Sequence, residues 1–135
     1  MRQAARYVTQ LYDRHLAASG LRTSQYGILA KLKRHGPMAI NELAAELVID
    51  RTTLGRNIRP LERDGLITIT PGQSDRRVKE LCLTPSGEDR LNETRGAWAA
   101  AQRSFESGFG PARSAELRGL LHALVESGLV PKDEG

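Results

Sequence analysis

The sequence predicts a mainly α-helical protein that carries one small β-hairpin. Apolar residues recur every three or four positions along most of the chain, which is the period of helices with one buried face. Residues 40–65 hold two such short patterns, separated only by a tight turn. A polar, glycine-containing loop at 71–77 then lies between two stretches with strand character. Two short helices followed by a hairpin are the elements of a winged helix-turn-helix, so we expect this architecture.

Length and composition fit a single folded domain over residues 1–135. Hydrophobic residues make up 39% and charged residues 27% of the chain, as in ordinary globular proteins. No apolar run approaches the roughly 18 residues of a membrane helix, and the first residues lack the apolar core of a signal peptide. We therefore expect a cytoplasmic protein that is not bound to a membrane.

Residues that could support metal, redox or catalytic chemistry are sparse. The single cysteine, Cys82, excludes an internal disulfide and a paired-cysteine metal site. His15, His35 and His122 lie far apart and lack a paired metal-ligand spacing, so we expect neither a metal ion nor a cofactor. The sequence holds no acid–base pair, nucleophile motif or phosphate-binding loop. We expect a protein that is not an enzyme.

Positive charge is concentrated in the middle of the chain. The formal net charge is +4. Residues 51–79 include seven basic and three acidic residues, a surplus of four, so the rest of the chain is neutral overall. An anionic partner would meet this segment first.

Three helices are expected before this basic segment. One face of the first helix, which Gly20 can end, carries Val8, Leu11, Tyr12, His15 and Leu16. Thr23 is a plausible N-cap for the second helix, which Gly36 can end. Residues 38–40 predict a very short strand, and Asn41 can cap the third helix. The side chains expected to point inward from the third helix are Leu43, Ala44, Leu47 and Val48.

The fourth helix has one apolar and one basic face. Asp50 can cap it, and Leu54, Ile58 and Leu61 form its buried stripe. The positions opposite that stripe are Thr52, Arg56, Arg59 and Arg63, with Thr53 and Gly55 toward the sides. Such a face fits the major groove of double-stranded DNA, with Thr52, Thr53 and Arg56 as base-reading candidates. The alternative is a charged face that is merely solvated, but the preceding short helix and the following hairpin favour DNA.

The hairpin carries the second candidate contact. Residues 66–70 alternate between apolar and polar, and Val78, Leu81 and Leu83 belong to the returning strand. The loop between them holds Arg76 and Arg77, which suit a narrow, electronegative minor groove. Arg77 is the favoured inserted side chain, and Asp75 could hold its guanidinium by a charge-assisted hydrogen bond. An ordinary exposed ion pair of little energetic value is the alternative.

The C-terminal region predicts two more helices. Thr84 and Pro85 begin a long helix with a sparse apolar stripe, which breaks at residues 108–111. The final helix is strongly apolar through Leu117, Leu120, Leu121, Leu124 and Val125. Packing of the first and last helices across a two-fold axis would bury this surface, and packing within the chain is the alternative. We expect a DNA-binding lobe at 23–84 and a helical dimerisation region at 1–20 and 85–135.

Two segments of the chain resemble the MarR family of bacterial winged-helix transcription regulators. They are NELAAELVIDRTTLGRNIRPLERDGLI at 41–67 and SDRRVKELCLTPSG at 74–87. The specific part is the wing pattern formed by Asp75, Arg77, Leu83, Thr84 and Gly87. The resemblance implies a homodimer on a pseudo-palindromic operator, usually as a repressor. It points to Thr52, Thr53, Arg56 and Arg77 as DNA contacts.

The resemblance also implies a small ligand. Many members bind small aromatic or phenolic acids in a cleft between the dimer helices and the DNA-binding lobe, and this binding releases DNA. Tyr12, His15 and Tyr26 could line such a cleft, although Tyr and His at helical spacing are also ordinary core residues. The sequence therefore predicts a homodimeric DNA-binding repressor. A winged-helix module for protein–protein interaction, with only nonspecific DNA affinity, is the alternative.

Overall fold

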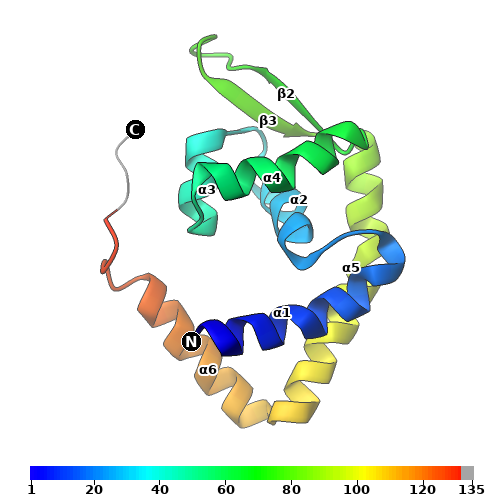
Figure 1. Cartoon of the computed structure of the whole chain (residues 1–135), viewed down its shortest axis with the longest axis vertical. Helices are drawn as coiled ribbons and strands as arrows, with labels where there is room; N and C mark the ends of the chain where they lie inside the picture. The colour runs from blue at the N-terminus through cyan, green and yellow to red at the C-terminus, as the bar shows by residue number, and fades with distance from the viewer. Residues whose placement is uncertain (132–135) are drawn as a thin grey trace.

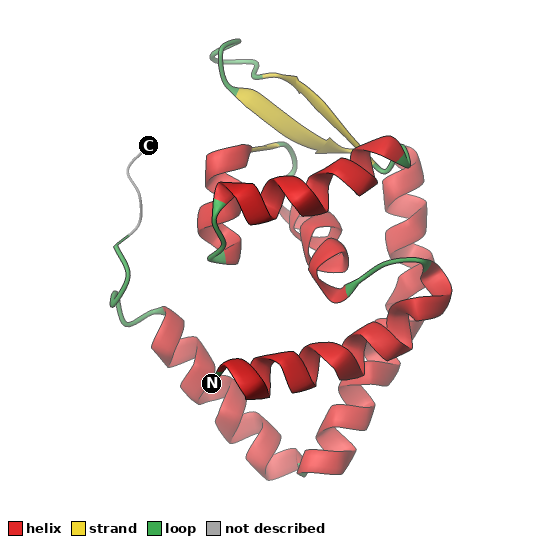
Figure 2. Cartoon of the chain, viewed as in Figure 1, coloured by secondary structure: helices red, strands yellow, loops and turns green. Residues whose placement is uncertain are grey.

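The structure is a computed structural model that describes residues 1–131. The last four positions of the predicted 85–135 region lie outside the described residues. The described chain is mainly helical with a small sheet, as predicted (Figures 1 and 2). The helices are α1 (Arg2–Leu16), a 3₁₀ turn (Ala17–Ser19), α2 (Thr23–His35), α3 (Ile40–Leu47), α4 (Arg51–Arg63), α5 (Pro85–Phe109) and α6 (Pro111–Val125). The strands are β1 (Met38–Ala39), β2 (Ile67–Pro71) and β3 (Lys79–Leu83).

The sheet is antiparallel, with its strands in the order β1–β3–β2. In the β2–β3 hairpin Ile67 lies opposite Leu83 and Pro71 lies opposite Lys79. The hairpin therefore closes through residues 72–78, which we call the wing loop. It leaves the helical body next to α4 and extends away from it (Figure 1).

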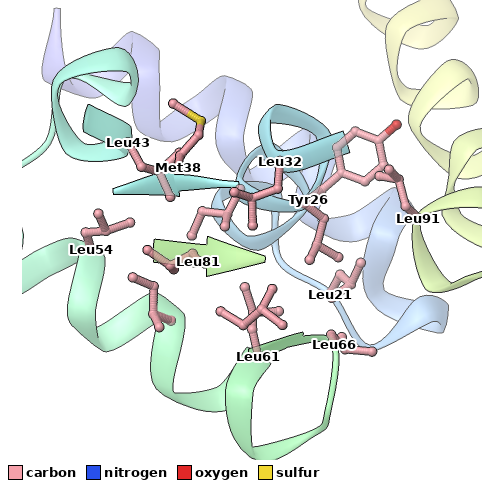
Figure 3. Packing of buried hydrophobic residues seen from close by; sticks show 14 of the residues in the cluster. Leu21, Tyr26, Leu32, Met38, Leu43, Leu54, Leu61, Leu66, Leu81 and Leu91 are labelled. Carbon is pink, nitrogen blue, oxygen red and sulfur yellow. The ribbon is translucent and has the colours of Figure 1, made fainter. Parts of the chain in front are cut away.

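The core lies where α2, α3, α4 and the sheet meet. Figure 3 shows Leu43 of α3, Leu54 and Leu61 of α4 and Leu81 of β3 gathered there, and all four side chains are buried. Leu54, Ile58 and Leu61 of α4 are buried together, so the predicted stripe is confirmed. Burying a leucine or isoleucine side chain contributes about 1.5–3 kcal/mol. Helix α4 is therefore fixed by one face and leaves the other free.

Helix α5 connects this lobe to the N-terminal helix. Thr84 caps it as expected, because its Oγ1 accepts a hydrogen bond from the Gly87 N–H at 3.0 Å. Arg90 donates to the Ser19 carbonyl at 3.1 Å. Helix α1 lies along α5, and the face predicted for it, which ends in the buried Leu16, is the covered one. Helix α5 is thus joined to the N-terminal segment by packing against α1 and by the hydrogen bond from Arg90 to Ser19.

Helix α6 turns away from α5 at Gly110, whose φ is 103°. Its apolar side chains stay open to solvent in the single chain: Leu120 is 62%, Leu121 50%, Leu124 46% and Val125 66% exposed. Packing within the chain, the alternative raised by the sequence, therefore does not cover this face. Among the described residues, no helix is long and apolar enough to cross a membrane.

Several predicted boundaries are wrong by one or two positions, and at the start of α2 a contact distant in sequence is the cause. The N-cap of α2 is Arg22, and Thr23 is the first helical residue. Asp13 of α1 accepts hydrogen bonds from the Thr23 N–H at 2.8 Å and its hydroxyl at 2.6 Å. Helix α3 begins at Ile40, so Ala39 rather than Asn41 is its N-cap. The β2 strand is displaced by one residue from 66–70 to Ile67–Pro71.

Two valines predicted to belong to regular elements lie outside them. Val48 ends α3 in the left-handed conformation, with φ 54°, and is 62% exposed instead of pointing inward. That conformation reverses the chain between α3 and α4 within a very short turn. Val78 precedes β3 and its side chain is exposed. Its carbonyl closes the wing loop by accepting from the Gly72 N–H at 2.7 Å.

Candidate nucleic-acid interface

The N-terminus of α4 is held by Asp50. Its carboxylate accepts from the Thr53 N–H at 2.8 Å and from the Thr53 hydroxyl at 2.8 Å. The hydrogen bond from the Thr53 backbone, followed by the one from its side chain, holds the pKa of Asp50 below its ordinary value. The predicted cap is thus confirmed, and it defines where the exposed face of α4 begins.

The face of α4 opposite the core is polar and basic. Thr52, Arg56 and Arg59 are exposed there, as the helical spacing predicts. Thr53 is exposed too, but its hydroxyl donates to Asp50. A Thr53 hydroxyl that donates to the cap can offer DNA only its acceptor lone pairs.

An open hollow of about 400 Å³ adjoins this face. Ile58 and Ile69 line it together with Gly55, which places α4 and strand β2 on two of its sides. Arg51, Thr52, Arg59 and Glu62 also line it. The exposed face of α4 and the base of the hairpin therefore border one concave surface, which Ile40 also lines and which combines isoleucine side chains with basic and polar ones.

The wing loop presents the second basic feature. Both carboxylate oxygens of Asp75 accept from the Arg77 guanidinium, from Nε at 3.2 Å and from a terminal nitrogen at 3.2 Å. The Arg77 N–H also donates to Asp75 at 3.0 Å. The Arg77 side chain, then its N–H, lowers the pKa of Asp75. The predicted hydrogen bonds are present, although the Arg77 side chain is 91% exposed and the pair is worth little to stability.

Arg76 stands beside this pair on the same loop. It is exposed and lines a shallow hollow of about 310 Å³ with Pro71, Gly72 and Gln73. The loop thus presents two adjacent guanidinium groups of which Asp75 fixes one. Both cations are exposed, so both can contact the phosphates of a DNA groove.

The three side chains considered for a ligand cleft lie away from α4. Tyr26 is buried and stacks on Trp98, with ring centroids 4.4 Å apart and planes at 14°. Tyr12 contacts the same indole at 4.6 Å, tilted by 53°. Burial raises the pKa of both tyrosines. His15 Nδ1 lies 3.0 Å from the Leu11 carbonyl oxygen. The structure joins the two tyrosines through Trp98 of α5.

Asn57 is a residue of the interface that sequence reasoning missed. Its Nδ2 donates to the Thr53 carbonyl at 3.1 Å, and its Oδ1 accepts from the Ser24 hydroxyl at 3.0 Å. The first bond lies within α4, and the second ties α4 to the start of α2. The spacing of Asn57 and Thr53 was visible in the sequence. The pairing with Ser24 was not, because the two residues are 33 positions apart.

Comparison with known proteins agrees with this geometry. The model of the MarR family matches residues 21–79, which carry α2, α3, α4 and most of the hairpin. The chain is 33% identical over 88 residues to the transcriptional activatory protein BadR of Rhodopseudomonas palustris, covering 63% of this chain and 50% of BadR. It is 32% identical over 74 residues to the transcriptional repressor MdtR of Bacillus subtilis, covering 55% of this chain and 48% of MdtR. The match thus spans about half the length of these two relatives.

A solved structure is similar over nearly the whole chain. The M. tuberculosis transcriptional regulator MosR shares 32% sequence identity and superposes with a TM-score of 0.76. The superposition covers 91% of this chain and 90% of MosR. The helices that flank the matched family region therefore follow the arrangement of a transcriptional regulator as well.

Proposed function

This chain belongs to the MarR family of winged-helix transcriptional regulators, and on that premise we propose that it binds double-stranded DNA sequence-specifically as a homodimer. In this proposal the exposed face of α4 enters the major groove. Thr52, Thr53 and Arg56 read base edges, and Arg59 contacts the backbone. The wing loop reaches the adjoining minor groove through Arg77, with Arg76 beside it.

The observation that supports the proposal is that α4 is held in place by contacts on one face and at its first turn. Buried leucines and isoleucine hold one side of the helix, Asp50 holds its first turn, and Asn57 ties it to α2. The exposed arginines therefore project from a rigid element. Arg77 is in turn held by Asp75 at the end of the neighbouring hairpin. Preorganised cations bind a charged, regular partner with a small loss of side-chain entropy.

Two arginine variants and a control test this assignment. Arg56→Ala should weaken binding and also change which sequence is preferred, because a base contact is lost. Arg77→Ala should weaken binding on all sequences to a similar extent. Arg103→Ala removes the same charge from an exposed site on α5 and should leave both affinity and preference unchanged. Equal losses on every sequence for Arg56→Ala would contradict base reading by this residue.

The homodimer is proposed from the exposed apolar face of α6, since a face of this size is unfavourable in water. A two-fold axis would place the two α4 helices about 34–36 Å apart, one turn of DNA. Leu121→Glu changes a side chain that is already exposed in one chain, so the chain should still fold. Light scattering should give a dimer for wild type and a monomer for Leu121→Glu. A wild-type monomer at micromolar concentration would contradict this part.

We propose repression as the regulatory outcome, through occupation of an operator. The names of the relatives point in both directions, since BadR is an activatory protein and MdtR a repressor. Transcription in vitro from a promoter that overlaps the selected binding sequence decides between them. Added protein should lower the transcript, whereas a rise would make the protein an activator.

A small aromatic or phenolic ligand that releases DNA is the remaining part of the proposal. The half-buried Tyr12 and Trp98, with Tyr26 and with His15 on the adjoining turn of α1, lie where α1, α2 and α5 meet. Trp98 is the only tryptophan, so its fluorescence reports on this place alone. Titration with 4-hydroxybenzoate should quench it saturably and weaken DNA binding. Quenching without loss of DNA binding would contradict a regulatory role.

The alternative function, a module that binds a protein partner, remains distinguishable by experiment. It predicts weak DNA affinity that is independent of sequence and falls steeply with salt. The exposed arginines on α4 and the wing loop favour nucleic acid over a protein surface.

A further inference from the structure

The wing loop is closed by bonds of its own backbone. The Gly72 N–H donates to the Val78 carbonyl at 2.7 Å, across the mouth of the loop. Inside it, the Val78 N–H donates to the Asp75 carbonyl at 3.1 Å. Residues 72–78 therefore form a compact turn rather than a free connection. The hydrogen bonds of Arg77 to Asp75 lie within this turn.

Glu80 attaches the turn to the sheet. Its carboxylate oxygen Oε1 accepts from the Gln73 N–H at 3.1 Å. Glu80 belongs to β3, the central strand, where it lies opposite Thr70 of β2 and Ala39 of β1. The backbone of Glu80 is thus paired with a neighbouring strand on both sides. A side chain on such an element can fix a loop more accurately than another loop residue could.

Gly72 leaves the space that this attachment needs. A Cβ at position 72 would lie 2.9 Å from Glu80 Oε1, 2.7 Å from the Asp75 carbonyl oxygen and 3.1 Å from the Val78 carbonyl oxygen. Any larger residue would push the loop away from the carboxylate. Glycine at 72 and glutamate at 80 therefore belong to one arrangement.

We propose that Glu80 is a positioning residue for DNA binding, which holds the wing loop so that Arg77 is presented to the groove in one place. This inference rests on the proposed function. Charge alone predicts the opposite effect, because a carboxylate beside DNA repels phosphate. Removal of the Glu80 charge by itself should therefore strengthen DNA binding. A residue that acts by its charge and one that acts by its hydrogen bond thus predict opposite results.

Two variants with the same change in charge separate these effects. Glu80→Gln loses the charge and keeps an oxygen that can accept from Gln73, whereas Glu80→Ala loses both. On a pool of random-sequence duplexes at one salt concentration, Glu80→Gln should bind at least as tightly as wild type. Glu80→Ala should bind about threefold to tenfold more weakly than Glu80→Gln, the range of one hydrogen bond. In an Arg77→Ala background the two variants should bind alike.

Gly72→Ala and hydrogen exchange supply independent measurements. Gly72→Ala should also weaken binding, whereas Gly96→Ala, at an exposed position of α5 with open space, should not. Exchange of the Gln73 amide should be faster in Glu80→Ala than in wild type and close to wild type in Glu80→Gln. Thermal unfolding should differ little among the Glu80 variants, since the loop is exposed.

Equal affinity of Glu80→Gln and Glu80→Ala would overturn the inference, because Glu80 would then act only by its charge. A difference that persists without Arg77 would overturn it as well. If wild type fails to bind DNA, the proposed function fails. The Gln73 exchange rates then decide alone whether Glu80 holds the loop: faster exchange in Glu80→Ala supports it, and equal exchange in both variants overturns it.

Discussion

Gly87→Ala tests the junction on which the hairpin and α5 depend. A Cβ at this position would lie 2.0 Å from the Leu66 carbonyl oxygen and 2.7 Å from Leu83 Cδ1. Both are too close, and the first belongs to backbone. The Leu66 carbonyl also accepts from the Thr84 N–H at 3.1 Å, and the Gly65 carbonyl accepts from the Thr84 hydroxyl at 2.6 Å. Making room for the methyl group must therefore open this junction.

The expected cost follows from those contacts. Overpacking costs about 1–3 kcal/mol, and a buried hydrogen bond that is broken adds about 1 kcal/mol. We expect the free energy of unfolding to fall by about 3 kcal/mol, and the melting temperature by about 10 °C. Urea unfolding followed by far-ultraviolet circular dichroism, at a fixed protein concentration, measures the change in the free energy of unfolding.

Gly96→Ala is the matched control in the same helix. Its added Cβ would meet nothing within 4 Å. Alanine is favoured over glycine inside a helix by about 1 kcal/mol, so this variant should be more stable than wild type. If Gly87→Ala unfolds within about 0.5 kcal/mol of wild type, a difference typical of a neutral surface site, the close packing described at this junction is refuted.

Three further predictions concern single residues. Val48→Gly should raise the free energy of unfolding by about 1 kcal/mol, because an exposed β-branched residue at φ 54° is strained; a loss of stability in urea unfolding would contradict this. The folded state lowers the pKa of Asp50, so the ionised cap stabilises the fold fully at pH values above the ordinary aspartate pKa. This stabilisation is lost as the pH falls through the lowered pKa of the folded state. At acidic pH the free energy of unfolding should depend less on pH in Asp50→Asn than in wild type, and an unchanged dependence would refute this role. Ser114→Ala should be neutral or stabilising in thermal unfolding, since the buried hydroxyl has no hydrogen-bond partner among the described residues; marked destabilisation would show a missed contact.

Features determined by short-range spacing were predictable from the sequence. The buried stripe of α4, the cap at Asp50 and the pairing of Asp75 with Arg77 each depend on residues at most seven positions apart. The same is true of Thr84 and Pro85 at the start of α5. In these cases the local pattern and the fold favour the same structure.

Features that depend on distant partners could not be predicted. Asp13 moves the start of α2 by holding Thr23, and Ser24 holds Asn57 from another helix. The link of Glu80 to Gln73 depends on the register of the hairpin, which the sequence does not determine. Val48 looked like the last apolar residue of a helix face, whereas the tight turn requires the left-handed conformation there. A single sequence contains no signal for such pairings.

Selection from a random duplex library at near-physiological salt measures whether the protein binds DNA sequence-specifically, because specific affinity should exceed nonspecific affinity by about 10³-fold or more. For a homodimer that reads bases through α4, we expect an enriched inverted repeat with half-sites about 34–36 Å apart, one turn of DNA. We also expect Arg56→Ala to enrich a different sequence. A bound fraction with no enriched motif would contradict the account and leave only charge-driven association with DNA.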